Sequence, residues 1–513
     1  MRGRQAGKFG NFMMTSYVAR EAARLGLEPA GENGSFFQTV PLVQRSIDST
    51  SSLIVGRDSL ALFADFAPMR PTPTLRVGRS LTGADLIPIY AGRAVDSAFV
   101  ITAEQATGRI VVFNAPLGTN GKPTATFSAA AADAVTRFPT ATAIAIANLD
   151  LLTPASAISL RSHAVAIVAG RDSTRPPPAG LLLSMRTASK IFGAPLDSLR
   201  AGALGIPVTA RIAFVDRPVE APGRNVIAMI RGSDAKLRGQ FIAIGAHSDH
   251  LGVAAVALDH DSLRAFNRVM RPEGAQSVAA VPTAAQLSRI RAILDSLRRT
   301  NRARLDSIYN GADDDGSGSV AELEIAESLA SAPSPGRSIL FVWHTGEEAG
   351  LLGSAWFTDT PTVPRDSIVA QLNMDMVGRG TAEDVSRGGP RNLQVIGAQR
   401  RSTELGNVIE EVNARRAEPY VIDYTFDAPR HPLNRFCRSD HYMYARYGIP
   451  IAFFSRGYHI DYHVVTDEPQ YIDYEGLARV AGFVRDVAVE LANRDQRLVI
   501  DRPKPVLHGP CRQ

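Results

Sequence analysis

The pattern of apolar positions changes near residue 206 of this chain. Beyond that point, short and nearly continuous apolar runs alternate with stretches of helical spacing. Such runs are typical of strands buried on both faces of a sheet, and they lie at 226–232, 241–247, 338–344, 368–377 and 449–455. The helical stretches lie at 319–331, 401–415, 439–447 and 474–494. This alternation predicts an α/β fold in which a mixed central sheet is sandwiched by helices.

The part before residue 206 has a different pattern. Residues 13–25 have helical spacing and end at Gly26, and an apolar run at 38–43 predicts a strand. From about 50 to 205 the apolar runs are interrupted by Gly, Pro and small residues, which predicts a smaller α/β or β-rich module. We assign this module no chemistry, because it has few His, Asp or Glu at metal-ligand spacing.

Composition limits the classes of protein. A length of 513 residues predicts two or three folded units, and 45% hydrophobic with 21% charged residues is typical of a globular protein. The net charge of +5 is spread along the chain, which argues against nucleic-acid binding. No apolar run is long enough to span a membrane, and the N-terminus has no apolar secretion segment, although a signal could precede its abrupt start. Cys437 and Cys511 are the only cysteines, which excludes a zinc cluster held by thiolates alone but allows one disulfide.

Two of the predicted strands end at residues suited to metal chemistry. His247 ends one run, and Asp249 lies two positions on, where its carboxylate could orient the imidazole. Another run leads through Gly346 to Glu347 and Glu348, which point apart in an extended chain. One of these glutamates could bind a cation while the other takes a proton from water, although a solvated pair is the ordinary alternative.

Three further groups follow the same pattern. Asp375 lies in an apolar strand, where an unpaired charge is costly. His463 belongs to the densest His cluster of the chain, and three consecutive acids, Asp313 to Asp315, lie in a glycine-rich loop before a helix. Groups at successive strand ends of one sheet converge. Oxygen and imidazole donors without thiolate suit Zn²⁺, with Mn²⁺ or Co²⁺ as substitutes.

The acidic loop also fits a different class of protein. Asp313 to Glu324 has the spacing of an EF-hand calcium loop, which would make the chain a non-catalytic metal-binding protein. Against this alternative, residues 310–312 interrupt the helix that should enter the loop, and only one such loop is present. A calcium loop also leaves His247, Glu348 and His463 without a role.

The ordered motifs HSD, GADDDGSG, GEE, NMDMVG and DYH resemble those of the co-catalytic zinc exopeptidases, which include bacterial secreted aminopeptidases and glutamate carboxypeptidases. The resemblance covers about 206–495 and, weakly, 10–45. It implies a metallo-exopeptidase, foremost an aminopeptidase, with two Zn²⁺ ions as cofactors and peptide or protein N-termini as substrates. It also implies an extracellular or periplasmic location, and the absence of a visible signal leaves the cytoplasm open.

The resemblance implies roles for individual residues. Asp314 bridges both metals, His247 and Asp375 complete one site, and Glu348 and His463 complete the other. Glu347 corresponds to the general base, and Tyr462 resembles a tyrosine that stabilises the oxyanion. The family also has a non-proline cis peptide after the bridging aspartate, which here joins Asp314 to Asp315.

The resemblance divides the chain into 1–48 and 206–495 as parts of the peptidase domain, 49–205 as a protease-associated-like domain, and 496–513 as a tail. His247 and Asp314 lie far apart in the sequence, whereas simpler members keep these ligands close together, so we interpret 253–308 as an insertion that overhangs the cleft. Within it, 283–308 has helical spacing.

One alternative within the family is a carboxypeptidase of the glutamate-carboxypeptidase type. Both activities share the metal site, but a carboxypeptidase needs Arg or Lys to anchor the C-terminal carboxylate. Arg435, Arg438 and Arg456 lie near the last motifs and keep this alternative open. The side-chain preference and the oligomeric state do not follow from the sequence.

Overall fold

The structure is a computed structural model that describes residues 2–70, 79–93, 101–117, 134–135, 137–168, 177–277, 280–300, 302–385, 387–505, 511 and 513. The chain divides into two compact units. One includes Met1–Pro41 and Glu220–Pro505, and the other includes Leu42–Val219.

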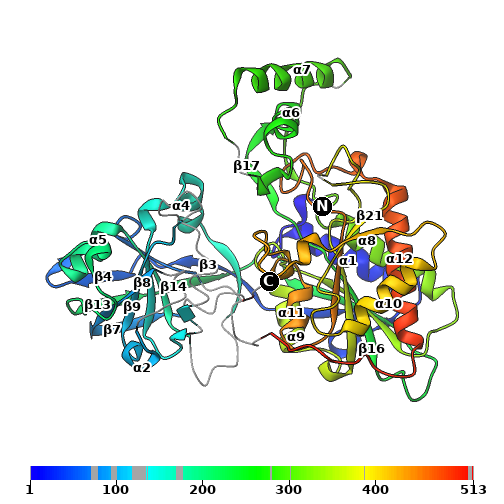
Figure 1. Ribbon diagram of the computed structural model, residues 1–513, viewed down its shortest axis with the longest axis horizontal. Coiled ribbons are helices and arrows are strands. Elements are labelled where there is room, and N and C mark those ends of the chain that lie inside the picture. Colours follow the sequence, from blue (N-terminus) through cyan, green and yellow to red (C-terminus); the bar gives the residue numbers. More distant parts are fainter. Residues whose placement is uncertain are drawn as a thin grey trace. The chain divides into compact units, whose positions relative to one another are not determined.

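A nine-stranded mixed sheet forms the centre of the first unit (Figure 1). In sheet order its strands are β1 (Glu28–Pro29), β15 (Gly223–Ile230), β19 (Ser338–His344), β16 (Phe241–His247), β20 (Ile368–Met374), β23 (Ile451–Ser455), β21 (Asn392–Ile396) and β22 (Val421–Asp423), with β2 (Phe37–Val40) also paired to β15. The central pairs from β19 to β23 are parallel, whereas β15 and β21 run antiparallel to their central neighbours. All residues of the four central strands are buried, as their apolar runs predict.

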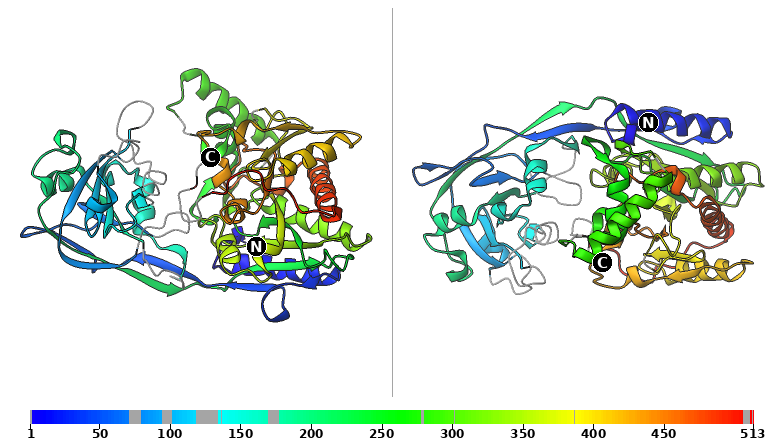
Figure 2. Two further views of the ribbon diagram at one scale, coloured as in Figure 1. Left: turned by 60° about the horizontal axis from the view of Figure 1, so that its bottom comes forward. Right: turned by 90° about the horizontal axis from the view of Figure 1, so that it is seen from above.

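Helices cover both faces of this sheet (Figures 1 and 2). On one face, four helices share a hydrophobic core with the strands: α1 (Phe9–Arg24), α8 (Gly316–Ala330), α10 (Thr403–Ala414) and α12 (Tyr474–Asn493). The other face carries α9 (Leu352–Asp359) and α11 (His441–Ala445). On β19, Trp343 Nε1 donates to Ser319 O of α8 at 3.1 Å, whereas the next residue, His344, contacts the rings of Phe357 and Tyr444 on α9 and α11. The predicted sandwich is therefore confirmed.

The predicted insertion forms a separate substructure of this unit. An antiparallel pair, β17 (Gly252–Asp259) and β18 (Leu305–Tyr309), frames the helices α6 (His260–Met270) and α7 (Ala284–Thr300). The helix predicted at 283–308 therefore ends at Thr300, and the rest of that stretch includes a strand. Helix α7 has no buried residue and lies outside the sheet (Figure 2).

The second unit contains three smaller sheets. A five-stranded sheet has the order β6 (Phe66–Pro68), β12 (Ala179–Leu183), β10 (Ala143–Ala147), β9 (Ile110–Asn114) and β8 (Pro88–Arg93), with all pairs parallel except that of β6. The others join β5 (Asp58–Ser59), β4 (Ser52–Val55), β13 (Val208–Ile212) and β7 (Leu81–Leu86), and β11 (Ala164–Ile167), β3 (Leu42–Ile47) and β14 (Phe214–Pro218). The helices whose bounds the structure describes in this unit are α2 (Ala103–Ala106), α4 (Pro154–Arg161) and α5 (Met185–Phe192).

Two features bear on the environment of the protein. Among the described residues, none of the helices combines the length and the apolar stretch that a membrane crossing requires. Cys437 and Cys511, the only cysteines of the sequence, are disulfide-bonded.

Candidate metal site

The five predicted ligands lie together at the carboxyl ends of the central strands. His247 is the last residue of β16, Asp375 follows β20 directly, and Glu348 lies in the loop after β19. Asp314 precedes α8, and His463 lies in the loop after β23. Because the central strands are parallel, their carboxyl ends meet at one edge of the sheet.

The two carboxylate oxygens of Asp314 face two different histidines. Oδ1 lies 3.2 Å from His247 Nε2, and Oδ2 lies 2.9 Å from His463 Nε2. On the first side, Asp375 Oδ2 lies 3.8 Å from His247 Nε2. On the second side, Glu348 Oε2 lies 3.0 Å from His463 Nε2. The five groups therefore form two sets that share Asp314.

The site has the donors and the charge that a divalent cation requires. His247 Nε2, Asp314 Oδ2 and Glu348 Oε1 are buried without a hydrogen-bond partner in the described structure. Burial raises the pKa of Asp375 to about 7, and burial together with the neighbouring carboxylates Glu348 and Asp375 holds the pKa of Glu347 well above its ordinary range. A cation would compensate these buried charges, and imidazole with carboxylate donors fits zinc.

The three consecutive acids of the loop have separate partners. Asp313 Oδ1 accepts a hydrogen bond from Gly378 N at 2.6 Å. Asp315 Oδ2 accepts from His247 N at 3.0 Å, so it fixes the end of β16 against the acidic loop. Asp314 then faces the histidines, and the peptide bond that joins it to Asp315 is cis, as the resemblance implies.

The structure does not support the calcium-loop alternative. Helix α8 begins at Gly316, so the fifth position, Ser317, already lies on a helix, whereas an EF-hand loop still bends around its ion there. Ser317 Oγ donates to Asp313 O at 2.8 Å, and Glu324 is exposed.

Asp249 contacts His247 through its main chain. His247 Nδ1 lies 3.2 Å from Asp249 O but 3.8 Å from its carboxylate Oδ1. The predicted carboxylate contact is therefore replaced by a carbonyl contact, and a carbonyl is also a usual partner for a metal-binding imidazole. The Asp249 carboxylate instead accepts from Glu347 N at 3.0 Å and so positions Glu347. Glu347 Oε2 lies 3.9 Å from His247 Nε2.

The side chain of Tyr462 lies in a stack of rings beside the site. Its ring centroid is 4.4 Å from that of Tyr458 and 3.9 Å from that of His463. Its hydroxyl is 3.5 Å from Arg438 Nη2, and Arg438 Nη1 donates to Gln276 Oε1 of the insertion at 2.6 Å.

The insertion contacts the loop that carries His463. Asn267 Nδ2 on α6 donates to Ile460 O at 2.9 Å, and Ala275 N donates to Tyr462 O at 2.9 Å. His260 Nε2 lies 2.9 Å from Glu468 Oε2 at the end of the same loop. These contacts were not predicted, because nothing in the sequence of the insertion indicates where it folds back.

Two other groups at the site were missed by sequence reasoning. Buried Arg4 donates from Nε to Ser248 O at 3.1 Å and from Nη2 to Gly311 O at 2.9 Å, so the N-terminal segment holds the loops of two ligands. Asp467 accepts from Asp314 N at 3.1 Å. Its place near His463 in the sequence is the one signal that could have indicated this role.

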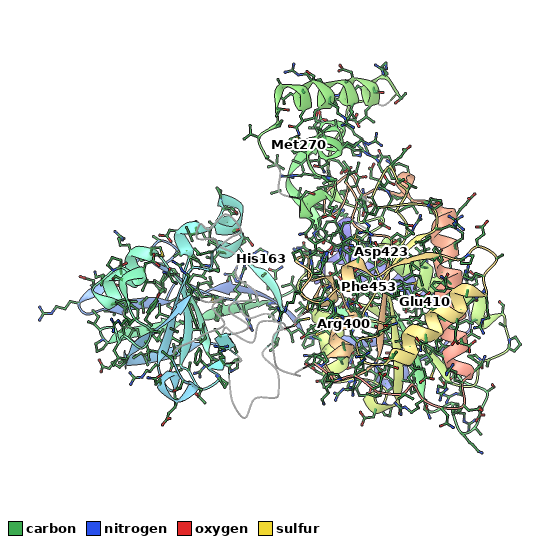
Figure 3. All side chains as sticks on the ribbon, viewed as in Figure 1. His163, Met270, Arg400, Glu410, Asp423 and Phe453 are labelled. Atoms are coloured by element: carbon green, nitrogen blue, oxygen red, sulfur yellow. The ribbon has the colours of Figure 1, made fainter. Side chains whose placement is uncertain are left out.

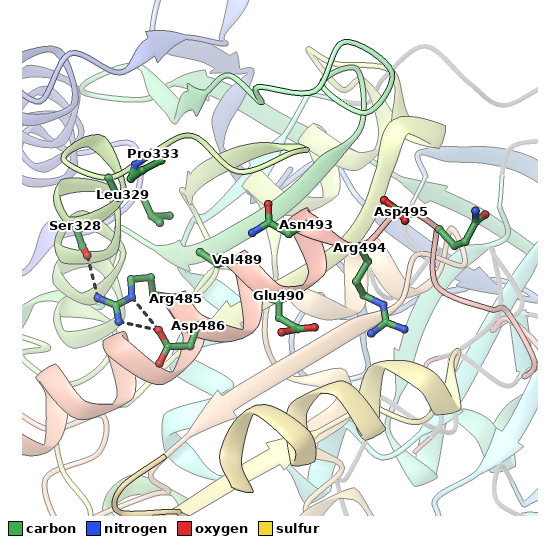
Figure 4. Close-up of a pocket in the computed structure, with 12 residues that line it drawn as sticks. Ser328, Leu329, Pro333, Arg485, Asp486, Val489, Glu490, Asn493, Arg494 and Asp495 are labelled. Atoms are coloured by element: carbon green, nitrogen blue, oxygen red, sulfur yellow. Dashed lines mark hydrogen bonds and ion pairs between the residues drawn. The ribbon is translucent and has the colours of Figure 1, made fainter. Parts of the chain in front are cut away.

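A surface pocket of about 830 Å³ lies at the other end of α8 from the candidate site (Figure 4). Arg485 on α12 donates to Ser328 Oγ at 3.1 Å there and pairs with Asp486 at 2.7 Å. The pocket is not lined by any of the candidate ligands.

The sequence model of peptidase family M28 matches residues 225–488, more than half of the chain. The chain therefore belongs to peptidase family M28, and the predicted resemblance is confirmed. The match contains all five segments that carry the predicted ligands, from His247 to His463.

The chain is similar to leucine aminopeptidase 1 of Paracoccidioides brasiliensis (strain Pb18), with 31% identity over 194 residues that cover 36% of this chain and 46% of that protein. An aminopeptidase of Pseudomonas aeruginosa (strain UCBPP-PA14) is 43% identical over 79 residues, 15% of either chain. The chain thus spans less than half the length of these relatives. Similar solved structures include an aminopeptidase from Aneurinibacillus sp. strain AM-1, with 17% identity, a TM-score of 0.46, and coverage of 98% of this chain and 93% of that one.

Proposed function

We propose that this protein is an aminopeptidase that hydrolyses N-terminal peptide bonds with two zinc ions. The observation that carries the proposal is the position of Asp314, whose Oδ1 and Oδ2 face His247 and His463 at 3.2 and 2.9 Å. A carboxylate placed in this way can hold one ion on each side. His247 and Asp375 would bind the first ion, and Glu348 and His463 the second.

When bound, the zinc ions would supply a Lewis acid for the scissile carbonyl and lower the pKa of water. Glu347 is placed to move the proton. Its main chain is held by Asp249, and its carboxylate lies 3.9 Å from His247 Nε2 without belonging to either group of candidate ligands. It would take a proton from the attacking water and return it to the leaving amine.

Tyr462 and Arg438 supply donors on the His463 side of the site. The ring of Tyr462 stacks on those of Tyr458 and His463, which fixes its position. Its hydroxyl faces a donor, Arg438 Nη2 at 3.5 Å, so the hydroxyl hydrogen remains available for a substrate oxygen. We propose that Tyr462 stabilises negative charge on the carbonyl oxygen as it develops during attack.

The arginines bear on the carboxypeptidase alternative. Arg435 is buried and stacks on Phe426 at 3.7 Å, and Arg456 is buried and pairs with Asp473 at 2.7 Å. Among the three predicted arginines, Arg438 is the one that stays partly exposed beside the site. Arg438 itself donates to Gln276 Oε1, so each of the three arginines already has a partner within the protein, which supports an aminopeptidase over a carboxypeptidase.

Blocked peptides test the direction of cleavage. Peptides with a free N-terminus and an amidated C-terminus should be hydrolysed, whereas N-acetylated peptides with a free C-terminus should not. The reverse preference would identify a carboxypeptidase.

Glu347→Gln tests the mechanism with the same substrates. We expect kcat to fall by a factor of about 10² to 10⁴, because a general base typically contributes that much. The zinc content of the purified variant should equal that of the wild type, since the proposed base is not a ligand. Near wild-type turnover would exclude Glu347 as the base.

We further propose that the protein works in an oxidising compartment and that the unit containing Leu42–Val219 is a protease-associated domain. The disulfide supports the first proposal, because such bonds persist outside the reducing cytosol. The small mixed sheets of that unit and its position in the sequence before the peptidase core support the second.

A further inference from the structure

His250 lies inside the candidate metal site but outside the five predicted ligands. It follows β16 by three positions, and its side chain is fully buried. Its Nδ1 lies 2.6 Å from Glu348 Oε1 and 4.0 Å from Asp314 Oδ2. Its ring meets that of His463 edge to face, with centroids 5.7 Å apart. The ligand atoms of His250, Asp314 and Glu348 lie within 4.8 Å of one another.

The surroundings of His250 do not explain it as an ordinary core residue. A buried histidine usually has at least one ring nitrogen in a hydrogen bond, but neither Nδ1 nor Nε2 has a hydrogen-bond partner in the described structure. Glu348 Oε1, which faces Nδ1, also lacks one. Two such atoms at 2.6 Å, without hydrogen-bond geometry between them, point to a partner that both would share.

The ring of His250 is also held in a defined position by its neighbours. It lies against Gly311, where an added Cβ would be 2.5 Å from ring atoms Cγ and Cδ2. Gly311 has a φ of +55°, in the region that favours glycine. The backbone N–H of His250 donates to the carbonyl of buried Arg4 at 3.2 Å. The fold therefore fixes this imidazole toward Glu348 independently of His463.

We propose that His250 is an additional zinc ligand, so that the second ion is bound by Asp314, Glu348 and two imidazoles. This inference rests on the proposed function, because it assumes a second ion. The two imidazoles differ in their setting, since His250 is fully buried and the side chain of His463 is 25% exposed. Zinc in catalytic sites reaches five-coordination, so four protein donors still leave a position for substrate.

The consequence is that the second ion should survive the loss of either imidazole. The experiment compares wild type, His250→Ala, His463→Ala and the double variant, each stripped of metal and titrated with Zn²⁺ by calorimetry. Co²⁺ titration, followed by its visible absorption, gives a second readout. His163→Ala is the matched control, because His163 is an exposed histidine of the other unit (Figure 3).

We expect wild type and control to bind two ions. Each single variant should also bind two, with one affinity reduced by at least about 10- to 100-fold, the loss that removing a mere hydrogen-bond partner of a metal ligand typically causes. The double variant should bind one ion. If His250→Ala binds two ions with wild-type affinities, or if His463→Ala alone binds a single ion, the proposal fails.

A further variant separates ligation from simple support of Glu348. His250→Gln keeps a hydrogen-bond donor but removes the imidazole. It should bind the second ion as weakly as His250→Ala, and full recovery with Gln would show that His250 only orients Glu348. Circular dichroism of the metal-free variants checks that each is folded. A wild type that binds fewer than two ions would overturn the proposed function instead, so the two failures are distinguishable.

Discussion

The two sides of the candidate metal site are built from different parts of the fold. On the first side, His247 ends a central strand and Asp375 follows another, and both main chains are held by the sheet. Asp315 fixes His247 through its backbone N–H, and Ser439 Oγ donates to Asp375 Oδ2 at 2.7 Å. This side therefore forms together with the sheet itself.

The second side depends on loops. Glu348 and His463 both lie beyond the ends of their strands, and His463 has a φ of +57°, which is uncommon for a residue other than glycine. The loop of His463 is held by the insertion, through Asn267 and Ala275. One ion would therefore be bound at the ends of core strands, and the other largely by loops, which open more easily than the sheet.

The largest effect on metal binding is expected when Asp314, the group that both sides share, is removed. Asp314→Ala should lower the bound zinc from two ions to none at micromolar metal and lower kcat by at least about 10³, because both ions lose a ligand and the remaining acids repel. Metal analysis of the dialysed protein and a peptidase assay measure the two changes. Glu411→Gln, an exposed carboxylate on α10, is the control. Retention of both ions would show that Asp314 is not the bridge.

The rate at which each zinc ion is lost should reveal the difference between the two sides. During dialysis against a chelator we expect two phases of zinc loss, with the second-side ion leaving first because its ligands lie on loops. Metal analysis at intervals gives both rates. Glu348→Gln should show the slow phase alone. A single phase in the wild type, or a Glu348→Gln variant that loses its zinc at the fast rate, would contradict the comparison.

A smaller effect is expected from the insertion. Asn267→Ala removes the hydrogen bond to Ile460 and should speed the fast phase several-fold, since one such bond contributes about 1 kcal/mol. The slow phase should not change. Arg291→Ala, on the exposed face of α7, is the matched control. An equal acceleration of both phases would mean that the insertion stabilises the whole unit.

The sheet and the five predicted ligands were predictable because they follow from local patterns. Buried parallel strands leave long apolar runs, and the predicted ligands His247 and Asp375 lie where two of those runs end. The place of His250 in the site was not predicted, because the direction of its side chain depends on the turn after β16 and on its packing against Gly311. The contacts of Arg4 with residues near 248 and 311 join segments hundreds of positions apart, and a single sequence contains no signal for them.

In the insertion, helical spacing in the sequence predicted only part of the secondary structure. The spacing at 283–308 predicted a helix, and α7 occupies its first part. The last part instead forms β18, which pairs with β17 and brings the chain back beside the start of the insertion, just before the acidic loop. Such a pairing is decided by a partner some fifty positions away and not by propensity.

Gly274 of the insertion packs closely against the His463 loop. A methyl group there would lie 2.4 Å from the carbonyl oxygen and 2.7 Å from the nitrogen of Tyr462. The exposed residues of α7 have no such neighbour and can vary without steric cost. Substitutions on the exposed surface of α7 should therefore be tolerated, whereas any side chain at Gly274 would press on the backbone next to His463, a proposed zinc ligand.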